Sequence, residues 1–426
     1  MKPIRDNARV LIASMVGTAV EYYDFFIYGT AAALVFGPLF FPSESEAAQT
    51  LLSLATFGLA FVARPVGAVV FGHYGDRIGR KATLVVSLLL MGIATLLIAF
   101  LPTYAMIGWI APLLLCSLRF IQGFGLAGEW AGAALLAAEY APPGWRARFV
   151  SVMQMGTPIG FFFATSIFML LTSTLTDAQF MAWGWRVPFV VSSVLVILGL
   201  WIRLNISETP EFKTALEKET PHKVPFVPLF KQHWGGLLAG AAGVIGTFAT
   251  FYLVTVFALA YATGPLGYAR DTFLGIQLVA NFFYAGGMIV AGIWSDRFAP
   301  EKVLIAGALL IGVVGLMFGP GLEGGMVTAT ATLCALMLAL GLANGPLGAW
   351  MSHLFPVPVR YSGVSIAFNT GGLIGGAAVP VAAQLLVAAG HPLWVGVVLA
   401  VAGMCTLIGA LFSRSYADAE LAVVGP

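Results

Sequence analysis

The chain has 426 residues, of which 59% are hydrophobic and only 9% are charged, and this composition excludes a soluble globular domain. Its formal net charge of +2 gives no basic surface of the kind that binds nucleic acid, so no nucleic-acid partner is expected. Three cysteines lie inside apolar runs without metal-ligand spacing, and neither a metal site nor a cofactor is predicted.

Twelve apolar segments are long enough to cross the hydrocarbon core of a membrane, which takes about 20 residues in a helix. They run near residues 10–38, 50–74, 82–101, 110–139, 149–173, 186–206, 234–262, 272–294, 303–320, 326–353, 361–389 and 392–413. A long polar segment at 207–232 separates residues 1–206 from residues 233–426. We therefore predict an all-α polytopic membrane protein with twelve transmembrane helices in two six-helix halves.

The distribution of cations predicts the orientation of the chain in the bilayer. Most of the 21 Lys and Arg residues lie in the termini and in the loops on the same side as both termini, while Arg186 and Arg270 lie near the opposite loops. Short loops rich in Lys and Arg stay in the cytoplasm. Both termini are therefore expected to be cytoplasmic, in a protein of the inner membrane. A twelve-helix unit with its own central cavity needs no partner, so we expect a monomer.

A short basic loop joins the second and third segments at residues 72–81, with the sequence Gly-His-Tyr-Gly-Asp-Arg-Ile-Gly-Arg-Lys. Asp76 lies among cations at the end of a helix, which suggests a charge latch, and the glycines let a neighbouring helix come close. The same spacing recurs in the second half, where Gly292 precedes Asp296 and Arg297. Such a repeat indicates two similar halves. We predict that these loop residues make and break contacts between the halves and so form a cytoplasmic gate: Gly72, Asp76, Arg77, Gly79, Arg80, Asp296 and Arg297.

Five ionisable residues lie inside apolar segments of the first half: Glu21, Asp24, Arg64, Arg119 and Glu129. A lone charge at the bilayer centre costs about 2.5–3.5 kcal/mol on insertion scales, so these groups are expected to face one another or a wet cavity. We predict that Arg64 and Arg119 bind substrate. The residues predicted to couple protons are Glu21, Asp24, Arg119 and Glu129. A buried pair of Arg64 and Asp24 that only joins two helices is the alternative.

The second half offers neutral polar side chains at the same depth instead of charges. The neutral residues predicted to contact substrate are Tyr28, Gln122 and Gln154 of the first half and Tyr252, Gln277, Asn281, Asn344 and Asn369 of the second. Amides in membrane helices also join neighbouring helices, and that is the alternative for each of them. Packing is the alternative for Tyr28, as it is for Tyr22.

Several stretches carry a family resemblance, beginning with Gly-Thr-Ala-Val-Glu-Tyr-Tyr-Asp-Phe-Phe-Ile-Tyr-Gly at 17–29 and Arg-Pro-Val-Gly at 64–67. The others lie at 119–130, 184–189, 208–212 and 355–363. With the loop at 72–81, they resemble the metabolite:proton symporter family of the major facilitator superfamily. The resemblance implies a major facilitator fold and the import of a small organic acid or zwitterion with a proton, by alternating access to one central site. The proton gradient would drive it without a cofactor.

The buried charges suggest how proton and substrate are coupled. A nearby guanidinium favours the charged form of a carboxylate. A substrate carboxylate that pairs with Arg64 or Arg119 is therefore expected to release Glu21 or Asp24 from that arginine and to favour its protonation.

Two other functions remain open on the sequence. A proton-coupled exporter shares the fold, and Gly-Thr-Pro-Ile-Gly at 156–160 is similar to the Gly-Pro motif of exporters. A polytopic membrane enzyme is disfavoured because the five histidines are scattered at or near helix ends, without a metalloprotease spacing. Among them, His353 is expected to cap a helix.

Overall fold

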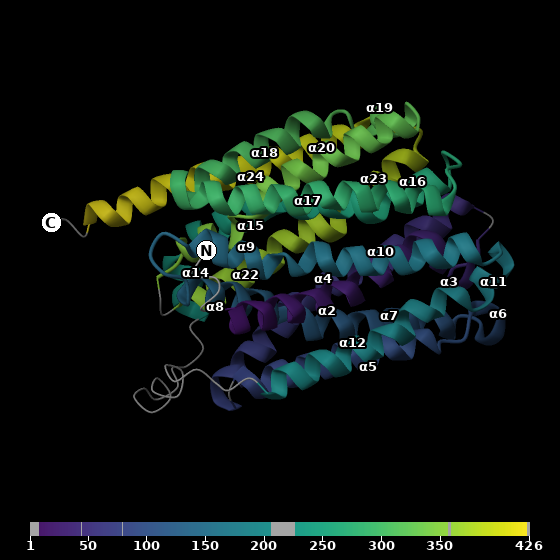
Figure 1. Ribbon diagram of the computed structural model, residues 1–426, viewed down its shortest axis with the longest axis horizontal. Helices are drawn as coiled ribbons and strands as arrows, with labels where there is room; N and C mark the ends of the chain where they lie inside the picture. Colours follow the sequence, from purple (N-terminus) through teal and green to yellow (C-terminus); the bar gives the residue numbers. More distant parts are fainter. Residues whose placement is uncertain (1–7, 44, 79, 206–225, 357–358, 424–426) are drawn as a thin grey trace.

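The computed structural model describes residues 8–43, 45–78, 80–205, 226–356 and 359–423. Most of these residues lie in helices that run along one long axis (Figure 1). Gly79 and residues 207–225 of the predicted central loop lie outside the described residues. So do the surroundings of five other predicted site residues, which are Gly72, Asp76, Arg77, Arg80 and Glu129.

The first half contains the helices from α2 to α12. They are α2 (Ala8–Ala31), η1 (Ala32–Phe36), α3 (Gly37–Phe40), α4 (Glu46–Ile78), α5 (Arg80–Ala99), α6 (Tyr104–Ile107), α7 (Ile110–Gly125), η2 (Leu126–Gly128), α8 (Glu129–Glu139), α9 (Arg146–Gln154), α10 (Gly156–Thr174), α11 (Asp177–Ala182), η3 (Gly184–Arg186) and α12 (Val187–Asn205).

The end of the predicted central loop forms a short helix, α14 (Phe226–Gln232), and the second half contains the helices from α15 to α24. They are α15 (Trp234–Tyr252), η4 (Leu253–Phe257), α16 (Ala258–Thr263), α17 (Arg270–Phe298), α18 (Pro300–Gly315), α19 (Phe318–Glu323), α20 (Met326–Asn344), α21 (Leu347–Ser352), α22 (Arg360–Gly372), η6 (Leu373–Ala378), α23 (Val379–Ala388) and α24 (Trp394–Val423). His353 is the C-cap residue of α21, as the sequence predicts.

Ten of the described helices are long and apolar enough to cross a membrane. The third predicted segment is α5, whose described apolar stretch, Val85–Ala99, is shorter. The ninth is interrupted at Leu316 and Met317, which divide it into α18 and α19. Large apolar side chains such as Ile93, Val194 and Val313 are exposed on the outer faces of these helices. In water such a surface would be a liability, whereas in a bilayer it is the surface that lipid covers.

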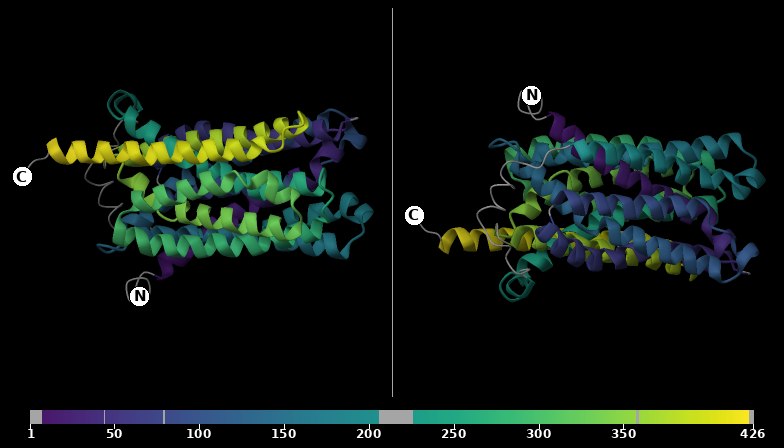
Figure 2. Two further views of the ribbon diagram at one scale, coloured as in Figure 1. Left: turned by 90° about the horizontal axis from the view of Figure 1, so that it is seen from above. Right: turned by 90° about the horizontal axis from the view of Figure 1, so that it is seen from below.

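Both ends of the described chain lie at the same end of the helical bundle. The first described residues and the end of α24 lie at the same end, which we call the terminal end (Figures 1 and 2). The opposite end, with α6, α11 and α19, is called the far end. Chains that cross a membrane an even number of times have this arrangement, and it agrees with twelve crossings.

Close backbone contact explains the glycines of the exporter-like motif. A Cβ built on Gly156 would lie 2.5 Å from the carbonyl oxygen of Met15, and one on Gly160 would lie 2.6 Å from that of Ala19. Both oxygens belong to α2, so the glycines let α10 pack directly on α2. The motif therefore has a packing role inside the first half.

Two π-helices occupy matching places in the halves. η1 directly follows α2 in the first membrane segment, and η4 directly follows α15 in the seventh. A π-turn frees backbone carbonyls from the regular i→i−4 ladder, and each is met by the next long helix of its half. Ser53 Oγ of α4 donates to the Ala32 carbonyl at 2.6 Å. Gln277 Nε2 of α17 donates to the carbonyls of Val254 and Thr255 at 2.7 and 3.0 Å.

Candidate functional site

A central cavity lies between the two halves, where mid-helix residues of both meet. It holds about 350 Å³ of space not filled by atoms, part of it open to solvent. Its walls are mostly aromatic and are formed by Tyr22, Trp130, Thr157, Thr247, Phe248, Phe251, Tyr252, Tyr284, Leu340, Asn344 and Phe368. All of these side chains are uncharged at neutral pH. The cavity therefore offers ring faces, hydroxyl groups and one amide to a ligand.

Aromatic side chains close the cavity towards the far end. Tyr252 of α15 packs against Phe25, Phe57 and Phe61 of the first half, with ring centroids 5.5, 5.1 and 5.3 Å away. The rings meet edge-on or tilted, which is the favourable arrangement for aromatic pairs. Since Tyr252 belongs to the second half, this cluster joins the halves above the cavity.

A stacked pair closes the cavity towards the terminal end. Trp130 of α8 and Phe368 of α22 lie parallel, with centroids 3.6 Å apart and an angle of 6° between the ring planes. Each ring belongs to a different half. Together with Tyr252, the pair supplies cavity walls from both halves.

The two predicted arginines lie behind the aromatic wall and do not line the cavity. The Arg119 guanidinium is 0% exposed and lies 3.9 Å from the Tyr28 ring and 4.3 Å from the Phe25 ring. The Arg64 guanidinium lies 4.6 Å from the Phe61 ring and 4.9 Å from the Phe25 ring. Such cation–π contacts stabilise a guanidinium that has lost its water. Two positive charges therefore lie against the rings that surround Tyr252.

A chain of hydrogen bonds connects Arg119 to the buried carboxylate of Asp24. Arg119 Nη1 donates to Gln122 Oε1 at 3.1 Å, and Gln122 Nε2 donates to Thr95 Oγ1 at 2.7 Å. Thr95 Oγ1 then donates to Asp24 Oδ2 at 3.1 Å, and Ser192 donates to Asp24 Oδ1. Asp24 is 1% exposed. The structure thus relates Asp24 to Arg119 through two neutral side chains instead of through direct contact.

Some donors of the arginines remain without a partner. Arg119 Nε and Nη2 and Arg64 Nε form no hydrogen bond within the described part of the chain. Buried guanidinium groups normally satisfy their donors, and a carboxylate is the acceptor that matches their geometry. The same region of α2 contains Glu21, which is also buried.

Three of the predicted substrate contacts instead join the halves. Gln154 Nε2 donates to the Asn344 carbonyl at 2.9 Å, and Asn369 Nδ2 donates to the Ala127 carbonyl at 3.0 Å. Asn281 Nδ2 donates to the Pro158 carbonyl at 2.9 Å. Asn344 ends α20 and Ala127 lies in η2, where helix breaks leave carbonyls without helical partners.

The other predicted contacts are divided between the cavity and the helix interior. Tyr252 and Asn344 line the cavity, and Asn344 Nδ2 donates to the Tyr284 hydroxyl at 2.5 Å. Tyr28 donates to Thr56 Oγ1 at 3.0 Å, inside the first half. Gln122 belongs to the hydrogen-bond chain from Arg119 to Asp24, and Gln277 donates to two carbonyl groups of η4.

The sequence did not single out two of the tyrosines in the cavity. For Tyr22, which follows Glu21 directly, the sequence analysis names packing and no contact with substrate. Tyr284 is three residues after Asn281 in α17, and residues three apart share a helix face. This spacing from Asn281 is the signal in the sequence by which Tyr284 can be found.

A carboxylate joins the halves at the terminal end. Asp296, near the end of α17, accepts hydrogen bonds from the backbone N–H groups of Ala147 and Arg148 at 3.0 and 3.4 Å. The Arg148 side chain adds an ion pair, with Nε 3.2 Å from Oδ2. Arg297, the neighbouring predicted gating residue, is exposed. We call the contacts of Asp296 with α9 the terminal latch.

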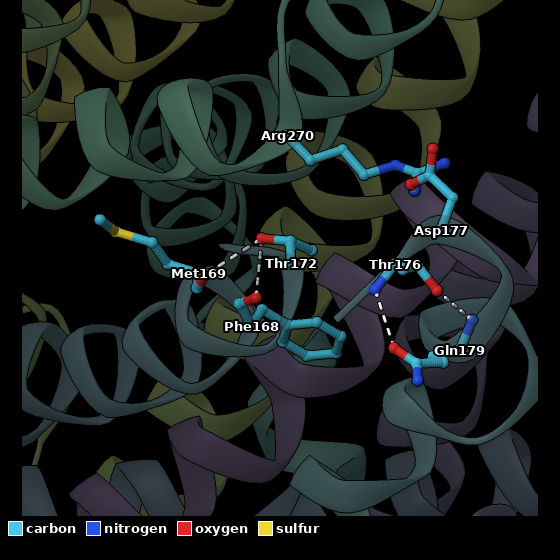
Figure 3. Close-up of polar contacts among 7 residues, drawn as sticks. All are labelled: Phe168, Met169, Thr172, Thr176, Asp177, Gln179 and Arg270. Atoms are coloured by element: carbon cyan, nitrogen blue, oxygen red, sulfur yellow. Dashed lines mark hydrogen bonds and ion pairs between the residues drawn. The ribbon is translucent and has the colours of Figure 1, made fainter. Parts of the chain in front are cut away.

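An ion pair joins the halves at the far end. Arg270 Nη1, at the start of α17, lies 2.6 Å from Asp177 Oδ1 at the start of α11 (Figure 3). Thr176 and Gln179 form a capping box that fixes the start of α11. The Asp177 side chain is 90% exposed and that of Arg270 is 31% exposed. The two halves are therefore in contact at both ends of the bundle in this conformation.

Comparison with known proteins identifies the family. The sequence matches the Major Facilitator Superfamily over residues 14–380. It is 45% identical to the Inner membrane metabolite transport protein YhjE of Escherichia coli K12, over 97% of this chain and 95% of that protein. It is 37% identical to the Shikimate transporter of the same organism, over 97% and 95%. It is 31% identical to the Proline/betaine transporter of Salmonella typhimurium, over 93% and 82%.

A solved structure shares the fold. The crystal structure of a D-xylose-proton symporter superposes with a TM-score of 0.75 over 95% of this chain and 96% of that one, at 18% sequence identity. This likeness concerns the fold and agrees with two six-helix halves around a central cavity. The chain belongs to the major facilitator superfamily and is an integral inner-membrane transporter of metabolites, not an enzyme.

Proposed function

We propose that the protein is a proton-coupled symporter that imports a small organic acid or zwitterion. The observation that carries this proposal is the hydrogen-bond chain from Asp24 to Arg119, which ends in guanidinium donors without a partner. The relatives named for shikimate and for proline and betaine support the substrate range, and the fold shared with a xylose–proton symporter supports the coupling.

The coupling follows from competition for one positive charge. Without substrate, Arg119 is the cation connected to Asp24, and it favours the ionised carboxylate. When the halves move and the rings of the aromatic wall separate, a substrate carboxylate binds the free donors of Arg119 or Arg64, and its negative charge offsets that cation. Protonation of buried Asp24 then becomes more favourable, since a charge without a counter-charge is costly in a low-dielectric interior. Substrate and proton therefore cross together.

Alternating access follows from the contacts at the two ends. In the sequence, the termini and the loops expected on their side of the membrane carry most cations, so the terminal end faces the cytoplasm in this proposal. Rocking of the halves breaks the ion pair of Arg270 and Asp177 when the cavity opens outwards. It breaks the terminal latch when the cavity opens to the cytoplasm. A monomer is sufficient for this cycle.

The test is uptake into proteoliposomes under an inward proton gradient. A mixture of shikimate, 2-oxoglutarate, citrate, proline, betaine and simple dicarboxylates is offered, and the internal contents are read by mass spectrometry. We expect accumulation of one compound that collapses with a protonophore. Asp24→Asn should abolish accumulation while leaving downhill exchange, and exposed Glu46→Gln serves as the control.

Two results would count against the proposal. Full gradient-driven accumulation by Asp24→Asn would remove Asp24 from the coupling step. Movement of a lipophilic cation against the proton gradient, without uptake of any acid or zwitterion, would favour the exporter. Because Gly156 and Gly160 have a packing role, their motif does not support the exporter.

A further inference from the structure

The stacked pair of Trp130 and Phe368 has an unusual place for an aromatic contact. Its rings line the cavity, are 7% and 6% exposed, and lie at the van der Waals spacing of two flat rings. Most other aromatic pairs around the cavity meet edge-on or tilted, as Phe248 does with Phe368 at 4.9 Å and 62°. Trp130 thus presents a ring face, and a flat partner covers it.

The pair must separate when the cavity opens at the terminal end. Phe368 moves with α22 and Trp130 with α8, and the two helices belong to different halves. The residue after Phe368, Asn369, donates to the Ala127 carbonyl just before α8, so ring contact and amide contact are lost together. Opening therefore uncovers an indole face that the protein otherwise keeps stacked.

The charges around the cavity favour a single negative charge. The side chains that line it are uncharged, so a second or third carboxylate would be buried without a partner. Of the charged groups that act on Tyr252, Arg64 and Arg119 are positive and Glu21 is negative. Phe248 spans from this side to the stack, with its centroid 6.0 Å from that of Tyr252 and 4.9 Å from that of Phe368. The ring of Phe248 thus lies between Tyr252, which the two arginines act on, and the stack.

We propose that the substrate is a monocarboxylate with a flat ring, and that its ring takes the place of Phe368 against the face of Trp130. This inference rests on the proposed function and narrows its substrate class. The substrate ring restores the stacking that opening removes, so the cavity opens to the cytoplasm more readily when a flat ring is bound. Trp130 is the residue that selects the ring, and the arginines attract the carboxylate.

The test compares benzoate with cyclohexanecarboxylate, which share the carboxylate and the carbon count but differ in flatness. Their binding to the purified full-length protein in lipid nanodiscs is measured by isothermal titration calorimetry, with succinate and glycine betaine as further probes. We expect benzoate to bind about three- to tenfold more tightly than cyclohexanecarboxylate, the range that aromatic pairing supplies. Succinate and glycine betaine should bind more weakly than benzoate.

Variants separate the stack from general packing. Trp130→Leu removes the ring face and should bring the ratio of the two affinities to about one. Trp130→Phe retains a ring face and should keep a preference for benzoate. Trp109→Leu is the matched control, since Trp109 is exposed on the outer surface and its loss should leave the ratio unchanged. The ratio in the unmodified protein tests the proposal even where a variant does not fold.

The outcomes also separate this inference from the proposed function. Equal binding of the two rings, or tighter binding of succinate or glycine betaine, overturns the flat-ring assignment whether or not a proton drives uptake. A clear preference for benzoate supports it. If benzoate binds with that preference but is never accumulated under a proton gradient, the symport proposal fails and the ring site stands.

Discussion

The carboxylate of Asp296 caps the first turn of α9, with Oδ1 3.0 Å from the backbone nitrogen of Ala147. The two residues belong to different halves, so this contact joins the halves at the terminal end. A helix N-terminus carries partial positive charge and unpaired N–H groups, both of which favour an anion. The side chain of Asp296 is 5% exposed, so water competes little for these bonds.

Replacing Asp296 with Ala should loosen the terminal end. Hydrogen bonds to charged groups contribute about 1.5–3 kcal/mol, which corresponds to roughly ten- to hundredfold in the closed-to-open ratio. Hydrogen exchange measured by mass spectrometry should show faster exchange in the first turn of α9 by about that factor. The peptide that contains α11, at the far end, is the internal control. Unchanged protection at Ala147 and Arg148 would mean that the latch does not hold the halves together.

The ion pair of Arg270 and Asp177 should respond to salt, because it is exposed. Exposed pairs contribute about 0.2–1 kcal/mol, and the Debye length falls from about 30 Å at 0.01 M salt to about 3 Å at 1 M. Spin labels at Thr174 and Thr272, which are exposed on either side of the pair, should report longer distances at high salt. Asp177→Asn should give the longer distances at all salt concentrations. A salt response that persists in Asp177→Asn would have to arise elsewhere.

Ala299 has a backbone conformation that favours glycine. Its φ is 78° and its ψ is 139°, between α17 and the first residue of α18, Pro300. A non-glycine residue in this region stores about 1–3 kcal/mol of strain. We expect Ala299→Gly to raise the free energy of unfolding by about 1 kcal/mol after the larger chain entropy of glycine is subtracted, measured by denaturation in detergent. Ala269→Gly is the matched control, because Ala269 has an ordinary φ of −63° at a similar ψ. This variant should lower the free energy of unfolding instead.

His353 should make stability depend on pH. Partial burial and the positive charges of Arg146 and Arg360 lower the pKa of His353 below its ordinary value, although Glu301 acts in the opposite direction. The unfolded chain, with a histidine pKa of about 6.5, then binds the proton first. Stability therefore falls as the pH drops below about 6.5 and is unaffected at higher pH. Thermal unfolding of His353→Gln should show a smaller loss between about pH 8 and pH 5.5, and His391→Gln is the control.

The sequence predicts the membrane helices well because lipid imposes a length and a composition on each of them. Even the interrupted ninth segment is found, since Leu316 and Met317 remain apolar where the helix breaks. Asp296 is predictable because its spacing repeats that of the first half. These features depend on apolar runs and motif spacings along the chain, which can be read from a single sequence.

The roles of the polar residues depend on packing and are harder to predict. Gln154, Asn281 and Asn369 could each hold a ligand or a neighbouring helix. The choice depends on whether a carbonyl of the other half lies within reach. The face-to-face stack of Trp130 with Phe368 likewise arises only when the halves come together. For Asp24, the sequence points to an arginine, while the structure interposes Thr95 and Gln122.

The paired π-helices, η1 and η4, show a further structural likeness between the two halves of the chain. Each arises when a helix accommodates one additional residue in a turn, and both halves have that extra residue at the same point, directly after α2 and after α15. The two halves therefore share a widened turn in their first helix, whereas η6 (Leu373–Ala378) of the second half has no π-helical counterpart in α10 of the first.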